Sequence, residues 1–281
     1  MSAKIETLVD GLTFPEGPRW HDGKLWFSDF YTYRVLRAGL DGKVETVAEV
    51  PQQSSGLGWT PAGDLLIVSM LDRKLLRMQG GKLQTFADLS PIATFHCNDM
   101  VVDKSGRAYV GNFGFDLHAG AAPRPASLAR VDPDGNVSVA ATDMMFPNGS
   151  VITPDGKTMV IAETIANRLT AFDIANDGAL SNRRLFAPLD GCFPDGICLD
   201  AEGAIWVADA RGMRVIRVFD GGRIERTIST GARRVFACML GGERRRTLFL
   251  CTSSGSGPDV AKKRDGKIEF AEVDVPGAGL P

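Results

Sequence analysis

The chain alternates polar turns with short apolar stretches, and the same pattern recurs along its length. Five segments share an apolar residue, a polar turn that ends in glycine and an apolar or alternating stretch: WHDGKLWFSD, WTPAGDLLIVSM, VDKSGRAYVGN, ITPDGKTMVIAE and LDAEGAIWVAD. A sixth, weaker copy is LGGERRRTLFLCTS. The turn glycines at positions 23, 63, 106, 156, 203 and 242 are 40, 43, 50, 47 and 39 residues apart. Short stretches of this kind, bounded by such turns, are typical of β-strands.

A second pair of strands follows several of these copies. It is found in RVLRAGLDGKVETVA, KLLRMQGGKLQTFA, SLARVDPDGNVSVAA, LTAFDIANDGALSNRRLFA and RVIRVFDGGRIERTI. Their Asp-Gly, Gly-Gly and Asn-Asp-Gly steps indicate hairpins, because these residues accept the positive φ of tight turns. Each unit thus contains about four strands, and four strands at a period of about 40 to 50 residues is typical of a propeller blade.

Six such units predict an all-β fold: a six-bladed β-propeller of four-stranded antiparallel blades around a central channel, in one domain over residues 1–281. A β-sandwich does not explain the regular period. The segment KIETLVDGL is a strand left over ahead of the first copy, and the sixth copy, which ends in GKIEFAEVDV, is one strand short. We therefore expect the N-terminal strand to complete the last blade.

The segments just ahead of the copies carry the candidate chemistry. They are FPEGPRW, SSGLGW, FHCNDMVV, FPNGSVI, FPDGICL and RVFACML. The innermost strand of each blade begins near the channel mouth, so equivalent residues of the six units converge there. An acid or amide occupies this position in four segments: Glu16, Asn98 with Asp99, Asn148 and Asp195. Three of these residues stand in one Phe-Pro-X-Gly frame, whose proline and glycine should present them in the same way.

Two carboxylates and one or two amide oxygens aimed at a common axis form an oxygen site suited to Ca²⁺, Mg²⁺ or Mn²⁺. These positions hold no His or Cys pair, so a closed zinc or iron centre is not expected, although Zn²⁺ fits a three-ligand oxygen site. The alternative interpretation is a blade-start turn in which the polar residue caps the backbone. Glutamate is a poor capper of this kind, and the second and sixth segments lack both the frame and the acid, which favours a metal site.

These segments resemble the senescence marker protein, gluconolactonase and luciferin-regenerating enzyme family of six-bladed propellers. The resemblance runs over essentially the whole chain and rests on FPEGPRWHDGKLWFSD, HCNDMVVDKSGRAYVGNFG, FPNGSVITPDGKTMVIAET and FPDGICLDAEGAIWVADARGMRV. It implies one divalent metal, with Ca²⁺ expected first, bound by Glu16, Asn148 and Asp195. It also implies that Asn98 lies beside the metal and contacts the substrate, and that the activity is lactone hydrolysis.

The predicted site contains what lactone hydrolysis needs. A divalent cation polarises a carbonyl and acidifies water, and a carboxylate within reach can take the proton of that water. We expect Asp195 to be this catalytic base as well as a metal ligand, as the resemblance suggests. The same site could instead serve an organophosphate or aryl ester hydrolase, and a non-catalytic propeller that binds a ligand or a protein is the alternative from a different class.

The substrate is expected to be less polar than a sugar lactone. Sugar lactonases of the family typically carry Arg two residues ahead of the Asn98 position, where this chain has His96. The residues expected to frame the mouth are mostly apolar: Phe14, Phe95, Met144, Met145, Phe146, Phe193 and Phe236. We expect His96, Phe146 and Asn112 to contact the substrate, with core packing as the alternative for the aromatic residues and a strand-end turn for Asn112. The insertion around His118 is expected to be a surface loop or a cover over the mouth.

Composition narrows the class of partner. Apolar residues make up 44% of the chain and charged residues 23%, values typical of a folded protein. The 32 basic and 34 acidic residues leave a formal charge of −2, which gives no field for nucleic acid or an anionic membrane. No signal-like or membrane-spanning apolar run occurs, and five cysteines without a CxxC pair favour a reduced, cytoplasmic protein in which two thiols can still lie close together. The expected partner is a small lactone or ester.

Overall fold

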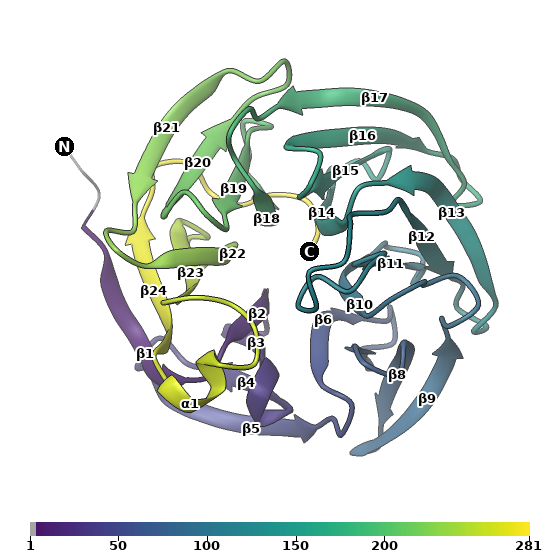
Figure 1. Ribbon diagram of the computed structural model, residues 1–281, viewed down its shortest axis with the longest axis horizontal. Helices are drawn as coiled ribbons and strands as arrows, with labels where there is room; N and C mark the ends of the chain where they lie inside the picture. The colour runs from purple at the N-terminus through teal and green to yellow at the C-terminus, as the bar shows by residue number, and fades with distance from the viewer. Residues whose placement is uncertain (1–3) are drawn as a thin grey trace.

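The computed structural model describes residues 4–281 and folds them into six four-stranded antiparallel sheets arranged in a ring (Figure 1). This confirms the six-bladed propeller predicted from the repeat. In each blade, successive strands of the chain lie side by side, so most pairing is between neighbours in sequence. The turn glycines of the repeat lie in the hairpins that join the first and second strands of the blades.

The blades follow the chain in order. Blade one consists of β2 (Pro15–His21), β3 (Lys24–Asp29), β4 (Arg34–Ala38) and β5 (Val44–Glu49). Blade two consists of β6 (Ser54–Trp59), β7 (Leu65–Ser69), β8 (Lys74–Gln79) and β9 (Lys82–Asp88). Blade three consists of β10 (Cys97–Val102), β11 (Ala108–Asn112), β12 (Ala126–Val131) and β13 (Val137–Met144). Blade four consists of β14 (Pro147–Ile152), β15 (Thr158–Glu163), β16 (Arg168–Ile174) and β17 (Leu180–Pro188). Blade five consists of β18 (Pro194–Leu199), β19 (Ile205–Asp209), β20 (Arg214–Val218) and β21 (Ile224–Ser229).

Blade six joins the two ends of the described chain. It contains β22 (Arg234–Gly241), β23 (Thr247–Ser253), β24 (Gly266–Glu272) and, as its outermost strand, β1 (Glu6–Leu12). Val9 of β1 pairs with Ile268 of β24, and both side chains are buried in the core that also contains Phe249. The expected closure of the ring by the N-terminal strand is confirmed.

The core lies between neighbouring blades. For example, Val35 of blade one packs in one cluster with Leu57 and Ile67 of blade two. Such burial of apolar faces supplies most of the free energy that holds successive sheets together. Cys198 and Cys238 bring their Sγ atoms to 3.8 Å across the contact of blades five and six, so two thiols do lie close together.

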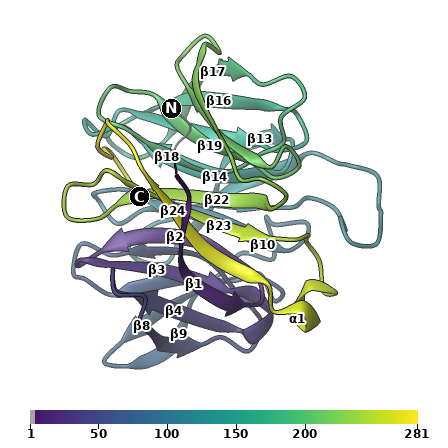
Figure 2. The ribbon, with the colours of Figure 1, turned by 90° about the vertical axis from the view of Figure 1, so that its left-hand side faces the viewer.

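In the part of the chain that the structure describes, helical structure is limited to η1 (Phe30–Thr32) and α1 (Val260–Lys263). Within residues 4–281, no helix is long and apolar enough to cross a membrane. Figure 2 shows α1 on one side of the ring and the C-terminal end toward the other. At that other side Leu280 forms an isolated β-bridge with Ile152, at the far end of β14. The innermost strands therefore run from the α1 side, where they begin, to the side of the C-terminal tail.

Candidate metal centre

A cavity of about 540 Å³ opens at the end of the channel where the six innermost strands begin. Its walls come from all six blades and from the segment Ser256–Pro258, which follows β23. Glu16, Asn98, Asn148 and Asp195 all line it, each from the start of a different innermost strand. The structure thus brings together four polar residues that are far apart in the sequence.

The Phe-Pro-X-Gly frame explains this common placement. The backbone N–H of Phe30 donates to Phe14 O at 3.0 Å, and Ala210 donates in the same way to Phe193 O at 3.0 Å. Blade four repeats this contact from Thr164 to Phe146 O at 3.2 Å. The residue two positions further along in each frame is therefore held in the same orientation at the start of its strand.

The glycine of the frame lets the inner strands approach one another closely. A Cβ on Gly149 would lie 2.6 Å from the backbone nitrogen of Ile197, and a Cβ on Gly196 would lie 2.4 Å from the Cβ of Ala237. Neither distance leaves room for a side chain. These glycines therefore set how tightly blades four, five and six close around the channel, and so how near the polar residues come to one another.

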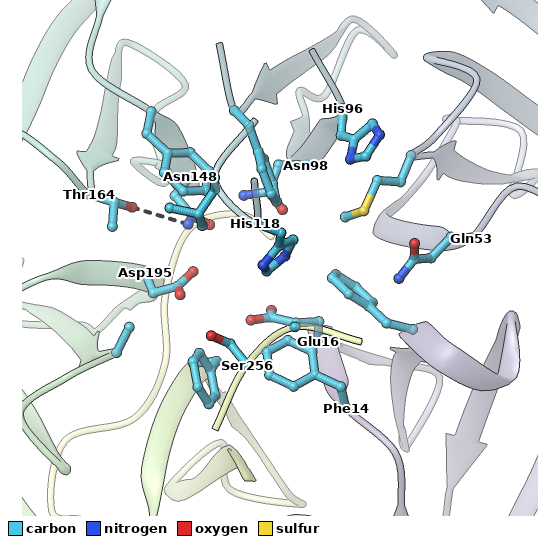
Figure 3. Close-up of a pocket in the computed structure, with 18 of the residues that line it drawn as sticks. Phe14, Glu16, Gln53, His96, Asn98, His118, Asn148, Thr164, Asp195 and Ser256 are labelled. Atoms are coloured by element: carbon cyan, nitrogen blue, oxygen red, sulfur yellow. Dashed lines mark hydrogen bonds between the residues drawn. The ribbon is translucent and has the colours of Figure 1, made fainter. Parts of the chain in front are cut away.

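Figure 3 shows Glu16 and Asp195 directing their carboxylates toward each other across the cavity, with the amides of Asn98 and Asn148 beside them. Asn148 Nδ2 donates a hydrogen bond to Thr164 Oγ1 at 3.2 Å, drawn in Figure 3, and the Thr164 hydroxyl donates to Pro194 O at 2.7 Å. Thr164 therefore fixes the amide so that Asn148 keeps its oxygen for another partner.

The two carboxylates of this cluster are unfavourable in their ionised forms. Burial first, and then the negative charge of Asp195, raise the pKa of Glu16 well above its ordinary value, against a backbone hydrogen bond from Gly17. Burial first, and then the charge of Asp99, raise the pKa of Asp195 in the same direction. In the described part of the chain neither carboxylate forms an ion pair, since Arg19, the nearby cation, pairs with Asp99.

Glu16, Asn148 and Asp195 fit a divalent ion by donor chemistry, with Asn98 adjacent. All four offer oxygen, the donor that Ca²⁺ and Mg²⁺ prefer, and a divalent charge would cancel the two carboxylates. Only two of the four are acids, and residues 4–281 contain no group of three or more His, Cys, Asp or Glu side chains placed to hold a metal. The fit to a divalent ion therefore depends on the amide oxygens of Asn98 and Asn148.

A second ring of residues surrounds the polar cluster. The position two residues before the metal position is Phe14, Gln53, His96, Phe146, Phe193 and Arg234 in blades one to six, and all six residues line the cavity. His96 is partly buried and stacks on Phe95 with 4.0 Å between ring centroids. Burial also lowers the pKa of His96, which favours its neutral form.

Phe146 is a strained member of this ring. Its φ of +60° is in the left-handed region, which bulky side chains rarely occupy. The ring is buried against Phe113, with centroids 4.5 Å apart. The surrounding structure therefore holds the backbone of Phe146 in a conformation that costs on the order of 1–3 kcal/mol, as is common in binding sites.

The structure does not bring Asn112 to the cavity, which corrects the expectation that it contacts substrate. Its side chain is fully buried, donates to Ser127 O at 2.7 Å and accepts from Gly114 N at 3.1 Å. Asp29 and Asp209 occupy the equivalent end of the second strand in their blades and likewise accept backbone N–H groups. Asn112 is therefore a strand-end capping residue, the alternative noted above.

Only some of the apolar residues expected to frame the mouth line the cavity. Phe14, Phe146, Phe193 and Phe236 line the cavity. Met144 is fully buried in a core cluster with Val101 and Leu128, and neither Phe95 nor Met145 is among the lining residues. Further apolar lining comes from positions that the sequence did not single out, including Tyr31, Met70 and Ile165.

From the sequence, no role in the site was assigned to Gln53, Thr164, Ser256, Arg211 or Arg234, which all line the cavity. Aligning the six segments by register would have indicated Gln53 and Arg234, because each stands two residues before the metal position of its blade. No comparable signal exists for Ser256, which lies in a loop. His118, from the insertion after β11, reaches the cavity and lies against Gly257, where a Cβ would be 3.3 Å from its Nδ1. The insertion therefore covers part of the mouth.

Comparison with known proteins agrees with this geometry. The model of the SMP-30/Gluconolactonase/LRE-like region matches residues 14–254, most of the chain. The chain belongs to the SMP-30/gluconolactonase/LRE-like family. The match runs from the frame of Glu16 to the end of β23 and so covers all the residues proposed to hold the metal.

Relatives in this family align over nearly their full length. Regucalcin from Danio rerio is 26% identical and covers 100% of this chain and 97% of its own. The 6-deoxy-6-sulfogluconolactonase from Pseudomonas putida is 29% identical, over 95% of this chain and 93% of its own. Pentonolactonase XacC from Haloferax volcanii is 28% identical, over 95% and 92%.

Solved structures of the family share the fold. A luciferin-regenerating enzyme superposes with a TM-score of 0.85 at 20% identity, covering 99% of this chain and 98% of that one. A calcium-binding protein, regucalcin, from Agrobacterium tumefaciens gives a TM-score of 0.83 at 22% identity, covering 99% and 97%. At these identities the likeness establishes the six-bladed architecture.

Proposed function

We propose that this protein is a metal-dependent hydrolase that opens lactone rings at the mouth of its central channel. The observation that carries the proposal is the pair of carboxylates of Glu16 and Asp195, which face each other in the cavity beside the amide of Asn148. Within residues 4–281 neither carboxylate forms an ion pair. Relatives named as lactonases support the reaction class, and relatives named regucalcin support Ca²⁺ first, before Zn²⁺, Mn²⁺ or Mg²⁺.

Each residue of the site has a distinct task in this reaction. Glu16, Asn148 and Asp195 hold the ion, which when bound polarises a carbonyl and acidifies water. Asp195 would help to hold the ion, and its carboxylate would also accept a proton from the attacking water. Asn98 offers an amide donor beside this point and is the expected contact of a substrate oxygen.

The cavity favours a lactone that is less polar than a sugar lactone. Phe14, Phe146 and Phe193 form half of the ring around the polar cluster, and burial lowers the pKa of His96, which disfavours its charged form. A substrate that carries several hydroxyl groups would leave them without partners on the aromatic side, at a cost of about 1–3 kcal/mol for each unpaired group. An alkyl or aryl substituent on the lactone would instead bury its surface there.

Proton release by the purified protein tests the proposal. The panel runs from aldonolactones to alkyl and aryl lactones, an aryl ester and an organophosphate, each with chelator and then with Ca²⁺, Mn²⁺, Mg²⁺ or Zn²⁺ restored. We expect chelator-sensitive turnover that is fastest with an apolar lactone. Preference for the ester or the organophosphate would change the substrate class, and no turnover with any metal would refute the hydrolase and favour a binding propeller.

A further inference from the structure

We infer that the substrate of this site carries an anionic group, bound by Arg211 and Arg234 at the mouth of the cavity. The inference rests on the proposed lactone hydrolysis and narrows its substrate to an acidic lactone with an apolar body. Both arginines line the cavity, and they come from the adjacent blades five and six.

Arg234 occupies a position that the fold directs toward the ligand. It is the sixth member of the ring whose other members are three phenylalanines, Gln53 and His96. Its main chain begins β22 and pairs with Ser253, so the residue is held at the start of the innermost strand of blade six. The side chain is half-buried and is the one fully charged member of the ring.

Arg211 is held at the same mouth by an aromatic ring. Its guanidinium carbon lies 4.1 Å from the centroid of Phe193, itself a cavity residue. Stacking on an aromatic face fixes the plane of a guanidinium and leaves its N–H groups free at the edges. The group is therefore positioned to donate to an anion that enters the cavity.

Neither arginine has an acidic partner in residues 4–281, although their neighbours in sequence do. Arg214, three residues after Arg211, pairs with Asp209 at 3.0 Å, and Arg233, directly before Arg234, pairs with Glu269 at 3.5 Å. Among the arginines without such a partner, Arg211 and Arg234 are the two that line the cavity, so they bring two unpaired positive charges to its mouth.

The charge of the loaded cavity leads to the same conclusion. The acids that line it are Glu16 and Asp195, and a divalent ion would cancel both. Two guanidinium charges then remain unmatched beside an otherwise aromatic wall. A carboxylate on the substrate would pair with them, and charge-assisted bonds of this kind are the strong ones in a site partly shielded from water. The aromatic wall requires that the rest of the substrate be apolar.

A matched pair of substrates tests the inference. The two γ-lactones carry the same alkyl arm, which ends in a carboxylate in one and in the uncharged carboxamide in the other. We expect the wild-type protein to prefer the carboxylate at least tenfold in kcat/KM, and this ratio to fall at high salt. Arg211→Gln and Arg234→Gln should each lower the ratio by about threefold to tenfold, and the double variant should bring it near one.

Arg223→Gln is the control. The guanidinium carbon of Arg223 lies 4.2 Å from the Phe219 ring, an arrangement like that of Arg211, but neither residue lines the cavity. This variant should keep the wild-type ratio, and thermal melts should show that all variants are folded. A wild-type ratio near one would overturn the inference. A preference for the carboxylate that persists in the double variant would also overturn it, because the carboxylate would then bind elsewhere.

Calorimetry separates this inference from the proposed function. Titration of 6-phenylhexanoate and of 6-phenylhexanamide into the protein with Ca²⁺ present requires no turnover. Tighter binding of the acid that is lost in the double variant supports the anion site even if no lactone is hydrolysed. Equal binding of acid and amide overturns the anion site even if lactones are hydrolysed.

Discussion

Replacing Asp195 with asparagine should have opposite effects on stability in the absence and in the presence of metal. Asn has nearly the shape of Asp but no charge. In the metal-free protein, burial and Asp99 raise the pKa of Asp195, so its ionised form is unfavourable in the fold. Asp195 is half-buried, and a hydrogen bond from Asn148 offsets part of this cost. We therefore expect Asp195→Asn to stabilise the metal-free protein by about 1 kcal/mol, which is a melting temperature higher by about 2 °C.

The pH dependence has a definite sign. A carboxylate with a raised folded pKa contributes stability that is fully present below its unfolded pKa, near 3.8, and is lost as the pH rises through the folded value. The wild type and the variant should therefore have similar metal-free stabilities at acid pH. Their difference should grow as the pH approaches neutrality, where the wild-type carboxylate must ionise.

With metal bound, the wild type should be more stable than Asp195→Asn. At a free Ca²⁺ concentration a hundred times Kd, binding stabilises the wild type by about 2.7 kcal/mol, whereas the variant has lost a charged ligand. Thermal melts by circular dichroism, with chelator and with added Ca²⁺, measure both effects, and Asp195→Asn should also abolish lactone turnover. Asp190→Asn, at an exposed position before the same strand, should change stability by no more than about 0.5 kcal/mol.

The reasoning fails if Asp195→Asn melts below the wild type in chelator, or if Ca²⁺ stabilises both proteins equally. The first result would mean that the carboxylate has a favourable partner in the metal-free fold. The second would place the ion away from Asp195. Near-wild-type turnover by the variant would remove Asp195 from the role of base.

Three further predictions concern the strand that closes the ring and two residues at or just after the end of β15. Deleting residues 1–12 removes β1 and the burial of Val9 and Leu12. The free energy of unfolding, measured with urea, should therefore fall by about 3–6 kcal/mol. An unchanged unfolding curve would contradict closure by β1. Thr164→Val removes the hydroxyl that holds Asn148, so calorimetry should show Ca²⁺ affinity lower by about tenfold or more and restored by Thr164→Ser; equal affinity in the Val variant would refute this role. Burial alone would raise the pKa of Glu163, but hydrogen bonds, first from Arg168, lower it overall. The ionised carboxylate therefore stabilises the folded protein by about 1–3 kcal/mol. This stabilisation is present above the unfolded pKa, near 4.5, and is lost as the pH falls through the folded value. Glu163→Gln should reduce the loss of unfolding free energy between neutral and acid pH, measured by urea unfolding. An unchanged pH dependence would contradict this role of Glu163.

The sequence alone was sufficient for the fold because the propeller is built from local contacts. Each blade pairs strands that are neighbours in the chain, so the period of turns and strands appears directly in the sequence. The closure by β1 was also readable, since one strand was left over at the start and one was missing at the end. Among the strand pairs of the described chain, the pairing of β1 with β24, which matches Val9 with Ile268, is the one that joins the two ends of the chain.

The proposed metal residues were readable for a related reason. Glu16, Asn148 and Asp195 stand in identical frames, and a repeat places identical frames at equivalent points around one axis. The same argument would have found Arg234 had the sixth segment been aligned by its register, because its position two residues before the metal position is that of Phe14 and Phe193. The sixth segment lacks the Phe-Pro-X-Gly frame, so Arg234 was not recognised as equivalent to these residues.

The direction of a side chain beyond the end of its strand depends on the packed molecule and is not visible in the sequence. Asn112 and Thr164 both lie near the end of a second strand, yet the amide of Asn112 caps its own blade, whereas the hydroxyl of Thr164 bridges Asn148 to Pro194 of the next blade. The meeting of His118 with Gly257 joins two loops of different blades that follow no period. The sequence determined the repeating strands and the residues at their starts, because local pairing and periodicity fix these. The contacts between blades depend on how the ring closes, and that is a property of the packed molecule.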